Sequence, residues 1–208
     1  MPVVNTLTVT SIALFGGFAL AAADKDLHFA PGPASSYPTR QTIEKVTIAA
    51  IPYTSEEQVR SAFGKLDPNK YGILPLLIVV HNESDQTLRL DNLKLEYITP
   101  SRTHIDATAA KDVPYVSGNI KQPKIENSPL PTGSPRVSRK KNPLAGGQID
   151  VRAFSARMLP QGEQASGFFY FQTLSRMGAK LYLTGIREAA SGKELFYFEI
   201  PLSYDGTR

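Results

Sequence analysis

The chain has 208 residues, of which 20% are charged and 41% hydrophobic, so one globular domain with appendages is expected rather than two full domains. It contains no cysteine, which excludes a disulfide framework, thiol catalysis and thiolate metal sites. The formal net charge is +4, but residues 117–147 hold six basic side chains and one acidic one, a net of +5, which leaves −1 for the rest. A chain-wide positive field of the kind that binds nucleic acid is therefore not expected.

The first 23 residues have the composition of a targeting segment. They contain no charged side chain, and the apolar run SIALFGGFALAAA ends in small residues, with Ala21 and Ala23 placed as in an A-x-A cleavage site. We interpret residues 1–23 as a signal peptide and expect a periplasmic or extracellular mature chain that begins near Asp24. One alternative is an uncleaved anchor in the inner membrane, because Leu7 to Ala23 matches the shortest spanning helices, ~17 residues. The other is a buried helix of a cytosolic protein.

Residues 24–42 are rich in Pro, Gly, Ser and Ala, which predicts a flexible linker before a folded domain at 43–208. The stretch IEKVTIAAIP, from Ile43, alternates as a strand does and ends at a proline. Thr54 and Glu57 then have the spacing of a capping box, and apolar residues recur behind them at helical spacing. A helix of about three turns is expected there, ending between Gly64 and Pro68.

From Ile73 onwards the apolar pattern has the period of strands. The stretch ILPLLIVVHN is almost continuously apolar, as in a strand that is covered on both faces. TLRLDNLKLEYI alternates with a change of phase, which indicates a bulge or a corner between sheets, and residues 104–108 suit a short strand. Further strands are predicted over IDVRAFSARML, ASGFFYFQT, AKLYLTGI and ELFYFEIPLSY, the last with Phe196, Phe198, Ile200 and Leu202 on one face.

The aromatic run in ASGFFYFQ is a packing signal. Phe169 and Phe171 alternate with Phe168 and Tyr170, so one pair is expected in the core and the other beneath a neighbouring loop or helix. A strand cannot present all four rings to one ligand. With seven or eight strands and a single short helix, the sequence predicts an all-β fold, a two-sheet antiparallel β-sandwich.

Residues 111–147 are predicted to form a long irregular insertion in this domain. Five prolines lie between Gln122 and Pro143, and proline continues neither a helix nor a strand ladder. The basic side chains of this insertion offer contacts to an anionic surface or an acidic protein patch, and the predicted partner-binding residues are Arg136, Arg139, Lys140 and Lys141. The alternatives are a solvated loop, or docking of SPLP or NPLAGG as an extended segment on another protein. No aromatic residues are interleaved with the basic ones, which argues against a nucleic-acid groove.

No motif in the chain indicates catalysis. A metal site needs about three or four converging donors, and the three histidines are His28, His81 and His104. His104 and Asp106 share a strand face and could orient each other, but a lone His/Asp pair is usually a solvated hydrogen bond. Ser138 and Lys141 have the S-x-x-K spacing, but their flanks are Pro-rich where that chemistry needs a helix start. We therefore predict a protein that is not an enzyme, with no catalytic residues, no metal and no cofactor.

Two stretches, VVHNESDQTLRLDNLKLEYIT and LPQGEQASGFFYFQ, resemble the Ig-like (telokin-like) domains of bacterial envelope proteins. In that family an N-x-S-D turn leads to a strand with a tyrosine, here Tyr97, and a P-x-G-E turn precedes a strand of the form G-aromatic-x-aromatic, here Gly167, Phe168 and Tyr170. The resemblance covers about residues 43–99 and 149–204, and the insertion and the lack of a lipobox cysteine depart from it.

The resemblance implies an extracytoplasmic Ig-like β-sandwich, used for binding or assembly and without catalytic residues. The predicted function is therefore an exported, non-enzymatic interaction or structural module of the bacterial cell envelope. Its expected partner is an envelope protein or an anionic surface, and the membrane itself only if residues 1–23 are not cleaved. The alternative is an envelope ligand carrier or hydrolase whose site lies between the sheets. No oligomeric state is predicted.

Overall fold

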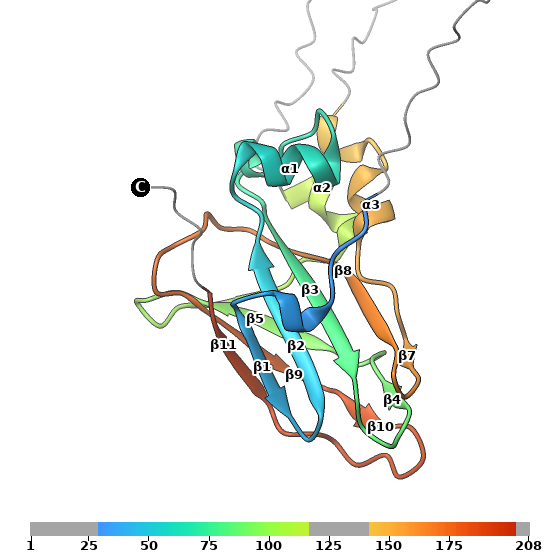
Figure 1. Ribbon diagram of the computed structural model, residues 1–208. Coiled ribbons are helices and arrows are strands. Elements are labelled where there is room, and N and C mark those ends of the chain that lie inside the picture. The colour runs from blue at the N-terminus through green and yellow to red at the C-terminus, as the bar shows by residue number, and fades with distance from the viewer. Residues whose placement is uncertain (1–28, 117–141, 203–208) are drawn as a thin grey trace, which may run out of the picture.

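A computed structural model of the chain describes residues 29–116 and 142–202 (Figure 1). The described part is mostly β, with antiparallel sheets and few short helices. The first sheet has the order β1–β2–β3–β8, formed by β1 (Arg40–Ile43), β2 (Val46–Pro52), β3 (Leu74–Asn82) and β8 (Gln164–Phe171). The second has the order β11–β9–β5–β6, formed by β11 (Phe198–Pro201), β9 (Lys180–Thr184), β5 (Lys94–Ile98) and β6 (His104–Asp106). The third, β10–β4–β7, consists of the short strands β10 (Arg187–Glu188), β4 (Leu88–Arg89) and β7 (Met158–Leu159).

The first and second sheets share one hydrophobic core. Alternate residues of β3 point into it, and they meet Leu181 and Leu183 of β9 together with Tyr97 of β5. All of these side chains are at most 3% exposed, as are Leu88 and Leu159 of the third sheet. The inner β3 residues are Leu74, Leu76, Ile78 and Val80.

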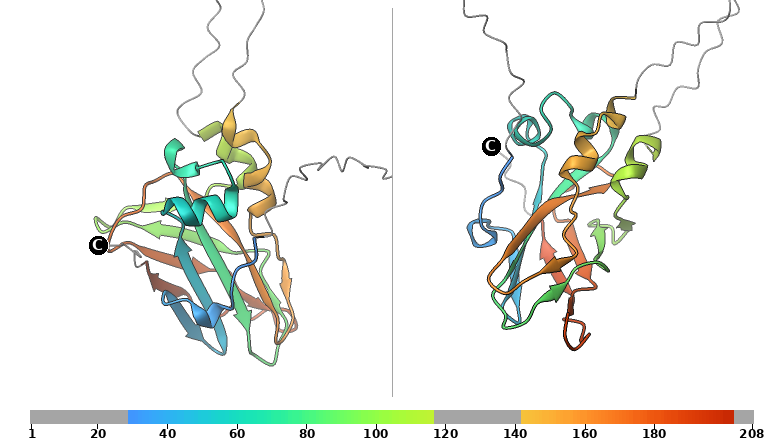
Figure 2. Two further views of the ribbon diagram at one scale, coloured as in Figure 1. Left: turned by 45° about the horizontal axis from the view of Figure 1, so that its top comes forward. Right: turned by 90° about the vertical axis from the view of Figure 1, so that its right-hand side faces the viewer.

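Helices cover the other face of the first sheet. They are α1 (Glu56–Phe63), α2 (Val113–Val116) and α3 (Gln148–Arg152), with the short 3₁₀ helices η1 (Ala34–Ser36), η2 (Pro68–Tyr71), η3 (Ala110–Asp112) and η4 (Pro143–Ala145). Figure 1 shows α1, α2 and α3 gathered at one end of the strands, with the third sheet away from them, and Figure 2 shows the same arrangement from two further sides. We call the three α-helices and these four 3₁₀ helices the helical layer.

Two predictions are confirmed: β3 is covered on both faces, and the aromatic rings of β8 divide between the two faces of the sheet. The strand β3 is buried along nearly its whole length, because its second face packs on the helical layer through Leu77 and Val79. In β8, Phe168 and Tyr170 lie under the helical layer, whereas Phe171 lies in the core between the sheets. The phenol of Tyr53 is also buried there, which raises its pKa to about 12.

The described residues contain more helix, and one more sheet, than the sequence indicated. Instead of one short helix there are three α-helices, and instead of two sheets there are three. The strand predicted from Ile149 is wrong, since residues 148–152 form α3 and only Met158 and Leu159 pair as β7. Ile149 and Val151 alternate as in a strand, but Ile149 is buried and Val151 is 77% exposed, as their positions on a helix dictate.

The linker predicted over residues 24–42 is wrong for residues 29–42. The ring of Phe29 packs 5.4 Å from that of Phe168, and Ala34 is fully buried. Gln164 accepts a 2.8 Å hydrogen bond from the Ala34 amide, so a long-range contact, not local propensity, holds this Pro-rich stretch. Residues 24–28 lie outside the described part of the chain.

Two element boundaries also differ from the prediction. The capping box of α1 is formed by Ser55 and Gln58, one residue after the predicted pair. The last strand begins at Phe198, so Phe196 is 67% exposed, whereas Phe198, Ile200 and Leu202 are buried as expected.

The side chain of Asn82 joins the first sheet to the third. It is completely buried, and its amide nitrogen donates to the carbonyl oxygens of Gln86 (2.8 Å) and Leu159 (3.0 Å). Its amide oxygen accepts from the amide and the hydroxyl of Ser84. The Asn82 backbone also bonds to Gly162 and Glu163, so the N-x-S-D and P-x-G-E turns form one structural unit.

Replacing Asn82 is expected to destabilise the fold strongly. Asn82→Ala removes the hydrogen bonds of a fully buried side chain to Leu159, Gln86 and Ser84, so the free energy of unfolding should fall by about 2–4 kcal/mol. Chemical denaturation measures this change, and Gln161→Ala, at an exposed position of the adjoining turn, is the matched control. Equal stability of the two variants would show that Asn82 does not have this role.

Because Gly167 has no side chain, the backbone at Phe154 can lie directly against strand β8. A Cβ atom at this position would lie 2.4 Å from the Cα atom of Phe154, whose amide donates to the Phe168 carbonyl. We expect Gly167→Ala to lower the free energy of unfolding by about 3 kcal/mol, because the backbone at Phe154 has to move. Ser166→Ala, at an exposed position of the same strand, should change it by less than about 0.5 kcal/mol in the same denaturation experiment.

Candidate partner-binding surface

The predicted partner-binding residues Arg136, Arg139, Lys140 and Lys141 lie outside the described residues, which end at 116 and resume at 142. The two described ends of the insertion are helical, which corrects the prediction of an irregular segment from 111 to 147. Residues 110–116 form η3 and α2, and residues 143–152 form η4 and α3. They are helical because Val113 and Leu144 bury their side chains in the core beneath the helical layer.

Asn142 ties the two ends of the insertion together. Its side-chain amide donates to the carbonyl oxygen of Pro114 at 2.6 Å, and its side-chain oxygen accepts from the amide of Leu144 at 3.0 Å. The described residues on the two sides of the insertion, up to Val116 and from Asn142 onwards, therefore meet at the same short helix. We call residues 113–116 and 142–152 the insertion base.

The insertion base is held firmly on the first sheet. Arg152 of α3 donates to the Ala62 carbonyl at the end of α1 (2.9 Å), and its guanidinium lies 5.2 Å from the ring centre of Phe29. The Tyr170 hydroxyl donates to the carbonyl of Ile149 (2.8 Å). Burial raises the pKa of the Tyr170 phenol far above its usual range, so the hydroxyl stays protonated and remains a donor.

Two apolar side chains of the insertion base face solvent. Tyr115 of α2 and Val151 of α3 are each 77% exposed. Exposed apolar side chains beside a segment of high positive charge form a surface with both apolar and electrostatic contacts to offer. The insertion base is therefore a candidate partner-binding surface.

The space between the first and second sheets is filled by side chains. The buried residues that pack there are aliphatic or aromatic, and the tyrosine among them, Tyr97, accepts a hydrogen bond from the Arg176 amide. Among the described residues, the buried polar side chains are Thr39, Thr47, Asn82 and Thr99, and each makes a hydrogen bond. This packing does not offer the convergent polar groups that a ligand or catalytic site between the sheets requires.

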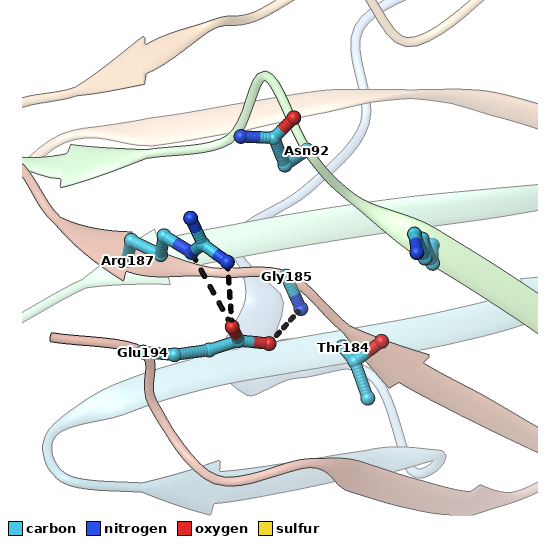
Figure 3. Close-up of a pocket in the computed structure, with 6 residues that line it drawn as sticks. Asn92, Thr184, Gly185, Arg187 and Glu194 are labelled. Atoms are coloured by element: carbon cyan, nitrogen blue, oxygen red, sulfur yellow. Dashed lines mark hydrogen bonds and ion pairs between the residues drawn. The ribbon is translucent and has the colours of Figure 1, made fainter. Parts of the chain in front are cut away.

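A pocket of about 250 Å³ opens beside β9 and is small for a ligand site. It is lined by Asn92, Lys94, Thr184, Gly185, Arg187 and Glu194 (Figure 3). The carboxylate of Glu194 is already engaged, because it accepts from the Arg187 guanidinium at 3.0 Å and from the Gly185 amide at 3.2 Å. No second carboxylate and no histidine line this pocket, so its residues do not form an acid–base pair.

His104 on the second sheet contacts a carboxylate of the neighbouring strand. His104 Nδ1 lies 2.6 Å from Glu96 Oε2 on the neighbouring strand β5, rather than against Asp106. Ile98 lies opposite His104, so Glu96 is its diagonal cross-strand neighbour, which long side chains can reach. Within residues 29–116 and 142–202, no group of three His, Cys, Asp or Glu side chains is placed to hold a metal ion.

Comparisons with known proteins identify no family. No protein-family model matches the chain, and no curated protein is similar to it. Among solved structures, the chain is similar to YcdA of Bacillus subtilis, a provisionally assigned lipoprotein, with 11% identity and a TM-score of 0.37. That match covers 78% of this chain and spans 38% of the YcdA chain. In the described residues, no helix has the length and apolar character needed to span a membrane.

Sequence reasoning missed the residues that position the insertion. Asn142 precedes a proline and accepts from the Leu144 amide, as N-cap residues do, so the Asn-Pro pair was an available signal for a helix start. Nothing in the local sequence marks Arg152, because its partners Ala62 and Phe29 are remote in the chain.

The link across the insertion base is testable with one substitution. Asn142→Asp keeps the acceptor for the Leu144 amide but removes the donor to Pro114, so the free energy of unfolding should fall by about 1–2 kcal/mol. Amide exchange of residues 113–116 should quicken more than that of β3. Asn92→Asp, at an exposed position, is the matched control, and an equal effect of both variants would contradict the role of this bond.

Proposed function

We propose that this protein is an exported, non-enzymatic interaction module of the bacterial cell envelope, built on an Ig-like β-sandwich. In this proposal the basic insertion contacts an anionic surface or an acidic patch of another envelope protein. The observation that carries the proposal is the hydrogen bond from Asn142 to Pro114, because it brings the two described ends of the insertion to a single place on the helical layer. The sequence between these two ends has a net charge of +5, which attracts anionic partners.

The packing of the described residues supports a binding role over catalysis. The space between the two large sheets is occupied by apolar side chains, and the pocket beside β9 has its single carboxylate paired with Arg187. A hydrolase or a carrier with a site between the sheets needs polar groups around an internal space. The exposed Tyr115 and Val151 instead supply apolar area beside the insertion.

The proposed location follows from the N-terminal sequence. The apolar run that ends at Ala23 is typical of a signal peptide, and retention of that run would leave the domain anchored in the inner membrane. The Ig-like assignment is supported by the two face-to-face sheets and by the joined turns around Asn82. A periplasmic or extracellular domain of this size does not require disulfides.

The proposal is tested by reversing the charge of the insertion. A full chain with Arg139→Glu, Lys140→Glu and Lys141→Glu should lose partners that the unchanged chain captures by crosslinking in intact cells. Each cation near an anionic membrane contributes about 1 kcal/mol, so the apparent affinity should fall by two orders of magnitude or more.

A matched control separates this site from net charge alone. The variant with Lys65→Glu, Lys94→Glu and Arg157→Glu makes the same change at three exposed positions dispersed over the described part of the chain. It should retain most of the partner. Unchanged capture by the insertion variant, or equal loss from both variants, would rule out the proposed contact.

A further inference from the structure

Two neighbouring loops expose apolar side chains away from the insertion base. One, residues 99–103, connects β5 to β6, and the other, residues 172–179, connects β8 to β9. They lie side by side in Figures 1 and 2, and a methyl group on Gly178 would be 3.8 Å from the ring of Pro100. Met177 is 84% exposed and Leu174 is 58% exposed. We call these two loops the loop tip.

The loop tip is held in shape by hydrogen bonds. The amide of Arg176 donates to the hydroxyl oxygen of Tyr97, a residue that is fully buried in the core. The amide of Ala179 donates to the Arg176 carbonyl across a turn in which Gly178 has φ 78°. In the other loop, Thr99 and Thr103 bond to each other through backbone and side chain. Met177 therefore projects from an ordered turn. Exposure of its apolar side chain to water costs free energy unless a partner covers that side chain.

The charge of the loop tip points to the class of partner. Neither loop contains an acidic residue, and both present an arginine to solvent, Arg102 and Arg176. Within the described residues neither guanidinium makes an ion pair, whereas Lys180 beside them pairs with Glu199. Apolar side chains flanked by unpaired cations match a bilayer surface, where acyl chains lie next to anionic phosphates.

We propose that the loop tip docks on the surface of an anionic lipid bilayer. Leu174 and Met177 insert among the outer parts of the acyl chains, and Arg102 and Arg176 bind lipid phosphates. The inference rests on the proposed envelope location, but it uses none of the residues of the basic insertion. It defines a second contact, with lipid, that fixes the orientation of the domain on the membrane.

The absence of tryptophan makes this inference directly measurable. Because the chain has no Trp, a full chain with Met177→Trp carries a single indole at the loop tip. On vesicles of phosphatidylcholine with phosphatidylglycerol, its emission should shift to shorter wavelength and be quenched by brominated acyl chains. On vesicles of phosphatidylcholine alone, it should stay as in buffer, whether or not another segment binds the lipid.

Two further variants test whether the emission shift is specific to the loop tip and whether it depends on the two arginines. Met158→Trp places the indole on the third sheet, at a position that is 50% exposed, and its emission should not change with either lipid. In the Met177→Trp background, Arg102→Gln with Arg176→Gln should raise the anionic lipid concentration needed for the half-maximal shift about 25-fold.

An indole at position 177 that stays in water while the chain sediments with anionic vesicles would overturn the inference, as would a chain that does not bind them. A shift without lipid that grows with protein concentration would indicate a second copy or a protein partner instead, and would also overturn it. If charge reversal at 139–141 abolishes partner capture but the indole at position 177 does not enter lipid, only the lipid contact of the loop tip is contradicted, and the proposed function stands.

Discussion

The fold depends on burying both faces of the first sheet. Its inner strand β3 and the second half of its edge strand β8 are too apolar for either face to meet water, so each face requires its own cover. The second sheet covers one face, and the helical layer covers the other. Each large side chain buried in this way contributes about 1.5–3 kcal/mol, and only a three-layer arrangement collects that contribution from both faces. The helical layer is thus a consequence of the composition of β3 and β8.

This constraint also determines where the chain displays its charged and apolar segments. Because the helices have to lie over Phe168 and Tyr170, the ends of the insertion come to rest on that face of the first sheet. Phe29 packs against the same aromatic cluster, so the N-terminal part of the domain joins the fold there too. The loop tip is instead positioned by Tyr97, from the core between the sheets. The insertion base and the loop tip are therefore positioned from the two opposite faces of the first sheet.

Local patterns in the sequence predicted the parts of the fold in which neighbouring residues decide the structure. The continuous apolar run of β3 and the alternation of rings in β8 led directly to burial on both faces. Alternation failed at Ile149 and Val151, because a two-residue spacing over one helical turn looks like a short strand. The packing of residues 29–42 was not predictable, since it depends on Gln164 and Phe168, far away in the chain. The loop tip was not predicted from the sequence, because one methionine and one leucine in a loop carry no periodic signal.

Our central proposal is that the insertion base and the loop tip, rather than the third sheet, are the surfaces through which this protein binds its partners. Hydrogen exchange of the full chain, with and without anionic membrane vesicles, tests that claim across the whole domain at once. The account predicts slower exchange in residues 99–103, 113–116, 142–152 and 172–179, with no change in β4, β7 and β10. Slower exchange confined to the third sheet, or no change in any of these segments, would contradict it.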